Sequence, residues 1–398
     1  MTLSDTRHQS PYRWVLITLC TITAIFGIAI PTISLSVLFA EISEDLNMTL
    51  VQVGLVWGIS SFTGMFLGLV GGILGDRFGT KNILTIACIG VGVLGASRGL
   101  VNGFEGFILM SFFMGLFAPL IAVNLHAVAG HWFAPNELGI ANGIISSGFA
   151  AGFLFGSLLA ASVLSPLLGG WRPVLFVYGG ISILLAIAWW ILNPADEQND
   201  QGDRKRISLR EGLPMVLRIR NVWLIGIGKI GLWGCVRGFT GYLPLYLREI
   251  GWDPNRADQA LGAFFVVSLI GAIPIPMLSD RLGVRPPFLI TAALCVGLGT
   301  IMTGFVSGGL IFLAAMLAGL MFDAFMGISI TAVSEIKELG GALIGTAVGA
   351  VFFLSDLGGT IAPPLGNALA EISLELPFYL WGGMALLGIV AFYSVTER

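Results

Sequence analysis

Long apolar runs separated by short polar gaps extend along the whole sequence. Most runs last about 20 residues or more, which is the length a helix needs to cross about 30 Å of hydrocarbon. The runs lack the strict alternation of a membrane β-barrel, and an open sheet would leave unpaired backbone groups in lipid. The pattern predicts an all-α integral membrane protein with twelve transmembrane helices. We place them at 14–40, 50–75, 82–101, 106–131, 138–166, 172–193, 221–247, 259–279, 286–306, 309–335, 341–369 and 375–395.

The longest polar stretch, Pro194 to Arg220, falls between the sixth and seventh spans. It predicts two pseudo-symmetric six-helix bundles: an N-terminal half at 1–193, a cytoplasmic linker at 194–220 with a short helix at 209–217, and a C-terminal half at 221–398. The composition agrees with this class, because 56% of the residues are hydrophobic and only 11% are charged, against about 25% charged in soluble domains.

Glycines recur every four residues in two spans. Span five carries Gly148, Gly152 and Gly156, and span eleven carries Gly345 and Gly349. Small residues at this spacing let helix backbones approach closely in a membrane. We therefore expect close helix crossings at both runs.

A short charged motif occurs twice, each time in the gap that follows the second span of a half. The two copies contain Gly72, Asp76, Arg77, Gly79 and Lys81, and then Asp280, Arg281, Gly283 and Arg285. A solvated turn would explain one copy, but two copies at matched positions indicate duplicated halves. An Asp at a helix end, near a basic residue and a neighbouring helix N-terminus, favours one packing of those helices.

This motif, together with two six-span halves joined by a polar linker, resembles the major facilitator superfamily of secondary transporters. The resemblance implies transport by alternating access without a cofactor, and a role for the motif residues as a cytoplasmic conformational latch. The second copy departs from the pattern, with Pro276 where a glycine would begin it. The run from Arg98 to Trp132, and Tyr242-Leu243-Pro244, are loosely similar to the cyanate-type and anion/cation symporter branches.

Two departures bear on the substrate. Span five has no Gly-Pro, which drug/proton antiporters of the superfamily usually show, and its stretch Ala151-Gly152-Phe153 lacks the Asn of the glycine-rich signature that nitrate porters usually show. The chain therefore resembles neither branch closely at this span.

Most of the 20 Lys and Arg residues fall on the side of the predicted membrane that holds both termini, the linker and both motif copies. The positive-inside rule makes this side cytoplasmic, so we expect a multi-pass protein of the plasma (inner) membrane. The first apolar run is too long for a signal peptide. Trp171 and Arg172 at the start of span six are expected to anchor that helix at the interface.

Two cations lie at membrane depth in span seven. By helical rise, Lys229 lies about 12 Å into the span and Arg237 about 12 Å further along. Charges at such depth are costly and mark functional sites by default, and Arg and Lys suit an anion. Lys229 could instead pair with Asp356 or Asp323, and Arg237 could lie in an outer vestibule. The candidate substrate-binding residues are Lys229, Arg237, Trp233 and Tyr242, although the aromatics could serve packing alone.

Three titratable residues are candidates for proton coupling: Asp356, Asp323 and His126. A carboxyl in a low-dielectric cavity holds its proton more tightly, and a neighbouring Lys opposes that effect. The alternative for both aspartates is a permanently paired counter-ion. His126 lies near the cytoplasmic end of span four, where a gate or interface role competes with coupling.

These observations favour proton-coupled symport of a small organic or inorganic anion. The alternatives are proton-driven efflux of an amphipathic compound and a non-transporting membrane sensor. An enzyme is not expected, because the sequence shows no nucleophile–base pair, metal cluster or phosphate loop. The four cysteines are scattered singly, and the net charge of −3 carries no nucleic-acid signal. We expect an anionic substrate, protons and membrane lipids as partners of a monomer, with no metal or nucleic acid.

Overall fold

The computed structural model describes residues 10–134, 137–194 and 209–395, and every regular element in these ranges is helical. The side chains of residues 68–70, 72–73, 76, 209–210 and 340–342 lie outside the description. Twelve stretches of the described chain are long and apolar enough to cross a membrane, which confirms the predicted number. They are Tyr12–Asp45, Leu50–Leu67, Thr80–Leu100, Phe104–Trp132, Leu138–Leu168, Trp171–Leu192, Arg220–Glu249, Pro254–Leu282, Pro286–Thr303, Leu310–Ser334, Leu343–Ala370 and Leu376–Tyr393.

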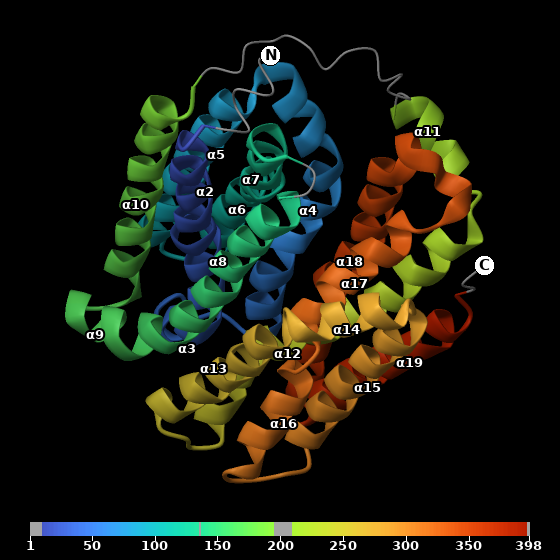
Figure 1. Cartoon of the computed structure of the whole chain (residues 1–398). Coiled ribbons are helices and arrows are strands. Elements are labelled where there is room, and N and C mark those ends of the chain that lie inside the picture. The colour runs from blue at the N-terminus through green and yellow to red at the C-terminus, as the bar shows by residue number, and fades with distance from the viewer. Residues whose placement is uncertain (1–9, 135–136, 195–208, 396–398) are drawn as a thin grey trace. The chain divides into compact units, whose positions relative to one another are not determined.

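The chain forms two compact units, both built of long helices (Figure 1). The first contains Met1–Asn47 and Val70–Asp200, and the second contains Met48–Leu69 and Gln201–Arg398. Helix α4 (Leu50–Phe78) therefore contributes its first part to the second unit and its last part to the first. The predicted division into halves at 1–193 and 221–398 keeps residues 48–69 with the first half, whereas these residues pack in the second unit. The division into two six-helix halves stays a prediction.

The first unit packs its helices around one apolar core. Its elements are α2 (Tyr12–Ile22), η1 (Thr23–Ala29), α3 (Ile30–Asp45), α5 (Thr80–Ser97), η2 (Arg98–Leu100), α6 (Phe104–Gly115), α7 (Ala118–Trp132), α8 (Leu138–Leu159), η3 (Ala160–Leu164), α9 (Ser165–Leu168) and α10 (Trp171–Leu192). Helix α10 packs along α5, and the π-helical segment η1 packs on α8. The core includes the buried residues Leu16, Leu84, Ile121 and Trp189.

The glycine run of span five makes the close crossing that its spacing predicts. A Cβ atom at Gly152 would lie 2.6 Å from Cβ of Ala29 and 3.1 Å from the carbonyl oxygen of Ile25. Because backbone cannot move aside as a flexible side chain can, α8 depends on glycine here to touch η1. The other run differs: no atom lies within 4 Å of a Cβ built at Gly345, so this glycine marks no close crossing among the described residues.

The second unit holds the first part of α4 and the remaining helices. These are α11 (Leu209–Val216), α12 (Arg220–Glu249), α13 (Pro254–Gly271), α14 (Pro274–Leu282), α15 (Pro286–Thr303), α16 (Leu310–Gly319), α17 (Phe322–Ser334), η4 (Lys337–Leu339), α18 (Gly340–Ala370) and α19 (Leu376–Tyr393). The short helix expected in the linker is α11.

Two long spans are broken where proline restarts a helix, at Pro119 in α7 of the first unit and Pro274 in α14 of the second. Proline suits the first turn of a helix because it has no N–H to donate.

Helix α12 is the centre of the second unit. It packs on both α18 and α19, and most of its residues are buried. A Cβ atom at Gly358 of α18 would lie 2.0 Å from the carbonyl oxygen of Ile230 of α12. Since the two backbones touch there, side chains that flank this contact are held at defined positions.

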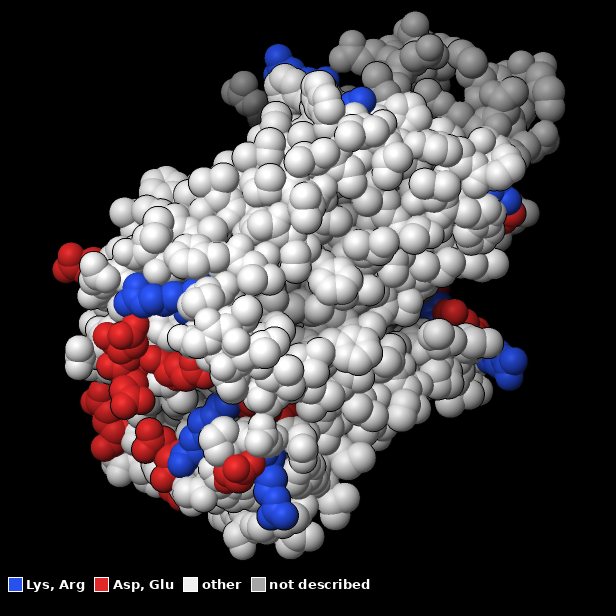
Figure 2. Space-filling model, turned by 90° about the vertical axis from the view of Figure 1, so that its left-hand side faces the viewer, with Lys and Arg blue, Asp and Glu red and all other residues white. Residues whose placement is uncertain are grey.

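The surface of the protein suits a bilayer. On the face seen in Figure 2, a broad expanse carries no charged side chain, and Lys, Arg, Asp and Glu gather toward its edges. Acidic side chains cluster at one end of this face. On this face, an uncharged area bordered by charged side chains suits contact with lipid tails and headgroups.

Candidate functional site

Three of the candidate side chains, Lys229, Trp233 and Arg237, lie on α12 at intervals of four residues. Residues at this spacing lie on one face of a helix, so the three form a row about 12 Å long. Lys229 is 1% exposed and Arg237 is 9% exposed. The row therefore places two buried cations inside the span Arg220–Glu249.

The first part of α4 holds the Arg237 side chain. The Cζ atom of Arg237 lies 4.0 Å from the centroid of the Trp57 ring. Nη2 donates hydrogen bonds to the carbonyl oxygen of Trp57 and to Oγ of Ser60, each at 2.8 Å. The indole nitrogen of Trp57 donates to the carbonyl oxygen of Arg237 at 2.6 Å. By contrast, Nε of Arg237 is buried without a hydrogen-bond partner. Arg237 is thus fixed in orientation but keeps one buried donor for a further acceptor.

Lys229 lies among aromatic rings. Its Nζ atom is 4.3 Å from the centroid of Phe352 on α18 and 5.7 Å from that of Phe325 on α17. Nζ also donates to Oγ of Ser329 at 3.1 Å. A protonated lysine carries three donors, and the ring faces attract its charge without accepting a conventional hydrogen bond. The ammonium group is therefore stabilised by its surroundings but not neutralised.

Asp356 of α18 is the carboxylate of this cluster. Its Oδ1 accepts a hydrogen bond from the indole nitrogen of Trp233 at 3.1 Å, and the Trp233 ring stacks on Phe322 with centroids 6.1 Å apart. The charges of Arg237 and Lys229 both act on Asp356. Trp233 therefore orients the Asp356 carboxyl group within reach of the electric field of both cations.

The cluster carries an excess of positive charge. Among the described side chains, no carboxylate oxygen lies within the 4.0 Å of an ion pair from Lys229 or Arg237. The structural ion pair considered for Lys229 is thus not formed as a direct contact. Two cations with one nearby carboxylate leave room for one further negative charge. Chemically, the arrangement can bind an anion and can exchange a proton at Asp356.

Asp323 has other partners. Oδ2 of Asp323 accepts a hydrogen bond from Oγ of Ser268 at 2.7 Å. The backbone nitrogen of Asp323 donates to Oγ of Ser268 at 3.0 Å. It lies in the first turn of α17, where a carboxylate interacts favourably with the helix dipole. These contacts connect α13 to α17, and the proton-coupling role of Asp323 stays a prediction.

The remaining candidates lie apart from the cluster. Tyr242 is 1% exposed, packs against Phe378 and Trp381, and donates its hydroxyl to the carbonyl oxygen of Leu374 at 3.3 Å. His126, in the first unit, is exposed, and its Nδ1 lies 2.8 Å from Oδ1 of Asn142. The structure thus brings together Lys229, Arg237, Trp233 and Asp356, and it adds Trp57, Ser60 and Ser329.

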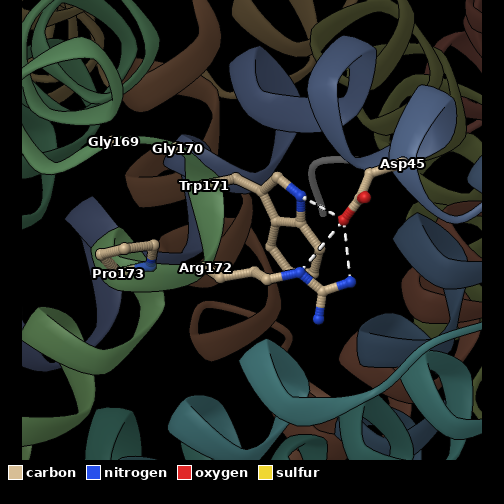
Figure 3. Close-up of a pocket in the computed structure, with 6 residues that line it drawn as sticks. All are labelled: Asp45, Gly169, Gly170, Trp171, Arg172 and Pro173. Atoms are coloured by element: carbon tan, nitrogen blue, oxygen red, sulfur yellow. Dashed lines mark hydrogen bonds and ion pairs between the residues drawn. The ribbon is translucent and has the colours of Figure 1, made fainter.

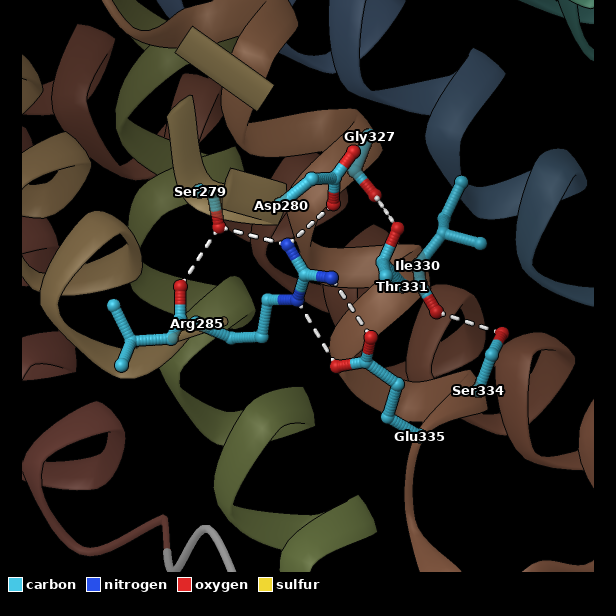
Figure 4. Close-up of polar contacts among 9 residues, drawn as sticks. Ser279, Asp280, Arg285, Gly327, Ile330, Thr331, Ser334 and Glu335 are labelled. Atoms are coloured by element: carbon cyan, nitrogen blue, oxygen red, sulfur yellow. Dashed lines mark hydrogen bonds and ion pairs between the residues drawn. The ribbon is translucent and has the colours of Figure 1, made fainter. Parts of the chain in front are cut away.

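The second copy of the duplicated motif forms an ion-pair cluster (Figure 4). Arg285 donates Nε and Nη2 to Glu335 at 3.0 and 2.7 Å, and Nη1 to Asp280 at 2.6 Å and Ser279 at 2.9 Å. The hydrogen bond with Glu335, first, and that with Asp280 raise the pKa of the Arg285 guanidinium above its ordinary value. Gly283 ends α14 with a φ of 68°, which favours glycine. These contacts fasten the α14–α15 turn to the end of α17.

The first copy is described only in part. The surroundings of Gly72 and the side chain of Asp76 lie outside the described residues. Gly79, with a φ of 82°, separates α4 from α5. Arg77 lies over the ring of Phe78 at 5.4 Å, and Nζ of Lys81 lies over the ring of Trp190 at 5.0 Å.

At the other end of the first unit, a pocket of about 280 Å³ surrounds the Trp171–Arg172 pair (Figure 3). Oδ2 of Asp45 accepts from Nε1 of Trp171 and from Nε and Nη2 of Arg172 at 2.8–3.1 Å. Nη1 of Arg172 donates to the carbonyl oxygens of Gly99 and Val101. Beyond the expected anchoring, these residues connect the ends of spans one, three and six.

The sequence left a weak signal for the missed residues. Ser60, Ser61 and Thr63 form a polar group inside the apolar span Leu50–Leu67. Hydroxyl groups in a membrane helix more often bond to their own backbone, as Thr63 does to Ile59 and Ser60. The pattern alone therefore does not single out Ser60.

Comparison with known proteins agrees with this architecture. The sequence model of the Major Facilitator Superfamily matches residues 15–257 and 247–398. A cis,cis-muconate transport protein of Acinetobacter baylyi is 23% identical over 90% of this chain and 88% of its own length. A probable sulfoacetate transporter of Cupriavidus necator is 24% identical over 92% of this chain and 89% of its own. A probable nitrate/nitrite antiporter of Thermus thermophilus is 24% identical over 63% of this chain and 57% of its own.

Solved structures share the fold. The nucleoside transporter NupG aligns with a TM-score of 0.80 at 15% identity, over 96% of this chain and 100% of the other. An unoccupied, inward-facing bacterial homologue of the lysosomal transporter Spinster aligns with a TM-score of 0.75 at 16% identity, over 97% and 96%.

Proposed function

Since the chain belongs to the Major Facilitator Superfamily and is therefore a multi-pass membrane transporter, we propose that it carries a small anion by alternating access, with proton symport. The observation that carries this proposal is the excess positive charge on α12. Lys229 and Arg237 are buried, lack a carboxylate within 4.0 Å among the described residues, and Arg237 keeps an unpartnered Nε. A buried unsatisfied donor is costly, and an anionic ligand would remove that cost.

The names of the relatives support an anionic substrate. They are described as carrying cis,cis-muconate, sulfoacetate and nitrate or nitrite. These molecules differ in size and shape but share negative charge. We propose that this chain shares that class, with Arg237 binding one oxyanion group and Lys229 supplying a second charge about 12 Å along the helix. Trp233 positions Asp356, and Tyr242 packs α12 against Phe378 and Trp381 of α19.

Asp356 is the proposed proton carrier. An anion that arrives at Arg237 and Lys229 competes with Asp356 for the same two charges, which favours a protonated Asp356. Moving an anion inward against an inside-negative potential costs about 2.3 kcal/mol per charge per 100 mV. A proton bound at Asp356 offsets that cost for one charge. Asp323 and His126 remain alternatives that the same transport assay distinguishes.

The motif residues complete the proposal. The Arg285 cluster and its counterpart around Asp76 and Lys81 would act as cytoplasmic latches between transport states. The proposal places both termini and the linker in the cytoplasm and the chain in the plasma (inner) membrane, as a monomer. It includes two six-helix halves at 1–193 and 221–398.

Proton-driven efflux of an amphipathic compound is the second candidate. The aromatic rings of Phe325 and Phe352 at Lys229, and of Trp57 at Arg237, favour it. Under this alternative the cations serve structure, and Arg237→Ala would leave binding of a neutral or cationic compound intact.

Thermal stabilisation of the purified protein separates the two candidates. The panel contains cis,cis-muconate, sulfoacetate, nitrate and L-galactonate, with lipophilic cations as the contrast. A ligand that binds only the folded protein raises the melting temperature by mass action. We expect a rise with one or more anions that Arg237→Ala and Lys229→Ala abolish. Arg256→Ala, which removes an exposed charge, is the control and retains the rise. A rise with lipophilic cations alone would exclude anion transport.

A further inference from the structure

The partners of Arg237 come from a helix that the two units share. Trp57 and Ser60 lie in residues 48–69, which belong to the second unit, whereas residues 70–78 of the same helix α4 belong to the first. Further contacts hold this first part of α4. Nδ2 of Asn367 donates to the carbonyl oxygen of Leu50 at 2.8 Å, and a Cβ at Gly54 would lie 2.7 Å from Cα of Pro364.

The guanidinium edge that binds a carboxylate is half occupied. Nε and Nη2 form one edge of the guanidinium group, which can bind the two oxygens of a carboxylate or similar oxyanion together. Nη2 already donates both its hydrogens, to Trp57 and Ser60. Nε on the same edge has no partner although it is buried. An anion can therefore use the whole edge only after Nη2 gives up one of its two bonds to α4.

Ser60 is the contact that can be exchanged most readily. Its hydroxyl accepts from Arg237 and at the same time donates to the carbonyl oxygen of Trp57 at 3.1 Å. The second of these hydrogen bonds does not depend on Arg237. Loss of the Arg237 bond would therefore leave the Ser60 hydroxyl satisfied.

We propose that Ser60 and the carbonyl group of Trp57 stand in for the anionic group of the substrate on Arg237, so that anion binding loosens the first part of α4 from the second unit. The inference rests on the proposed function, because it requires an anion at Arg237. It assigns to Ser60 a positioning role: the residue competes with the substrate instead of binding it. Arrival of the anion is thereby connected to helix α4, which has residues in both units.

Substitution of Ser60 distinguishes a competitor from a ligand. A competitor's removal tightens anion binding, whereas a ligand's removal weakens it. The experiment measures Kd for cis,cis-muconate and sulfoacetate in the full-length wild type, Ser60→Ala and Thr63→Ala. We expect Ser60→Ala to lower Kd about tenfold or more, as loss of one charge-assisted hydrogen bond from the free state would. Thr63→Ala is the matched control, since its hydroxyl bonds only to its own helix.

Hydrogen exchange in the wild type gives an independent readout. A bound ligand ordinarily slows exchange throughout a protein, but here addition of the same two anions is expected to speed exchange of peptides within residues 50–63. Ser60→Ala is expected to show faster exchange there before any anion is added. Thr63→Ala should match the wild type.

The possible outcomes distinguish a failure of this inference from a failure of the proposed function. An unchanged or higher Kd in Ser60→Ala, with binding that still requires Arg237, would overturn this inference and leave the proposed function standing. Slower exchange in residues 50–63 on anion addition would overturn it as well. If none of the four anions of the thermal-stabilisation panel binds, or if binding is unaffected in Arg237→Ala, the proposed function fails and the inference with it.

Discussion

The guanidinium group of Arg237 meets three requirements at once. It stacks on Trp57, donates twice through Nη2 and retains a free Nε. A planar fork can do this because its donors point in fixed directions, whereas an ammonium group offers a compact charge on a flexible stem. The identity of this residue therefore matters beyond its charge.

Arg237→Lys tests that distinction. The substitution keeps the positive charge but loses the fork and its stacking. We expect the Kd for the transported anion to rise about tenfold or more, in line with about 1.5–3 kcal/mol for a hydrogen bond to a charged group. Isothermal titration measures it, with Arg256→Lys as the control. Equal Kd values in Arg237→Lys and wild type would show that charge alone suffices.

The proton-carrying role of Asp356 is testable by an isosteric change. Asp356→Asn keeps an oxygen for the Trp233 indole but cannot lose a proton. In proteoliposomes, we expect uptake driven by a pH gradient to be abolished while anion exchange between the two sides continues. Asp323→Asn is the comparison and should keep gradient-driven uptake, because Asp323 is bound by Ser268. The reverse pattern would assign the proton to Asp323.

At this scale, sequence predicts types of residue better than their partners. Lys229, Arg237 and Asp356 were identified because a charge inside an apolar run is costly wherever it points. Ser60 and Trp57 were not assigned to Arg237, because a hydrophobic pattern records burial but not which distant segment supplies the contact. Asp323 shows the same limit, since its partner Ser268 lies on another helix.

Among the elements, helix α12 determines where the charged row lies. The sequence predicts α12 as one of twelve membrane spans, because each apolar run has the length needed to cross lipid. The breaks within spans were less so: the π-helical segment Thr23–Ala29 falls inside an uninterrupted apolar run. Glycine spacing alone does not show whether another helix packs against the glycines. Gly152 lies against η1, as its spacing predicts, whereas no described atom lies close to Gly345.

Gly358→Ala tests the packing of α12 on α18. The added methyl group would meet the carbonyl oxygen of Ile230, so the helices must separate. We expect a loss of about 1–3 kcal/mol of stability, as for other overpacked sites, together with weaker anion binding. Gly383→Ala in α19 is the matched control, because nothing lies within 4 Å of its Cβ. Thermal unfolding in detergent measures both, and equal melting temperatures would contradict the close contact.

For the whole molecule, we propose that the duplicated motif affects the interconversion of transport states. The copy at Arg285 is fastened to Glu335 by two hydrogen bonds. The sequence predicted the motif because both copies repeat the same residues, but it did not indicate Glu335, which lies at the end of α17 and outside the repeat.

Glu335→Gln removes the ion pair while keeping the shape of the side chain. We expect a lower maximal transport rate with little change in anion Kd, because the latch affects interconversion of states and not the site itself. Initial-rate uptake in proteoliposomes, paired with binding in detergent, makes the comparison. Glu338→Gln changes an exposed neighbour and should behave as wild type. A parallel loss of binding would place Glu335 in a purely structural role.

Residues 48–69 belong to the second unit, although residues 70–200 separate them from the rest of it in the chain. A gene divided after Asp200 would encode two fragments, and the second would lack Trp57 and Ser60. Nη2 of its Arg237 would lose both acceptors, and breaking the partnership of a buried charge is strongly destabilising. The second fragment should therefore be degraded when made alone and rescued when both are produced in one cell. Split-gene complementation, rather than independent folding of the halves, follows from sharing one helix between two units.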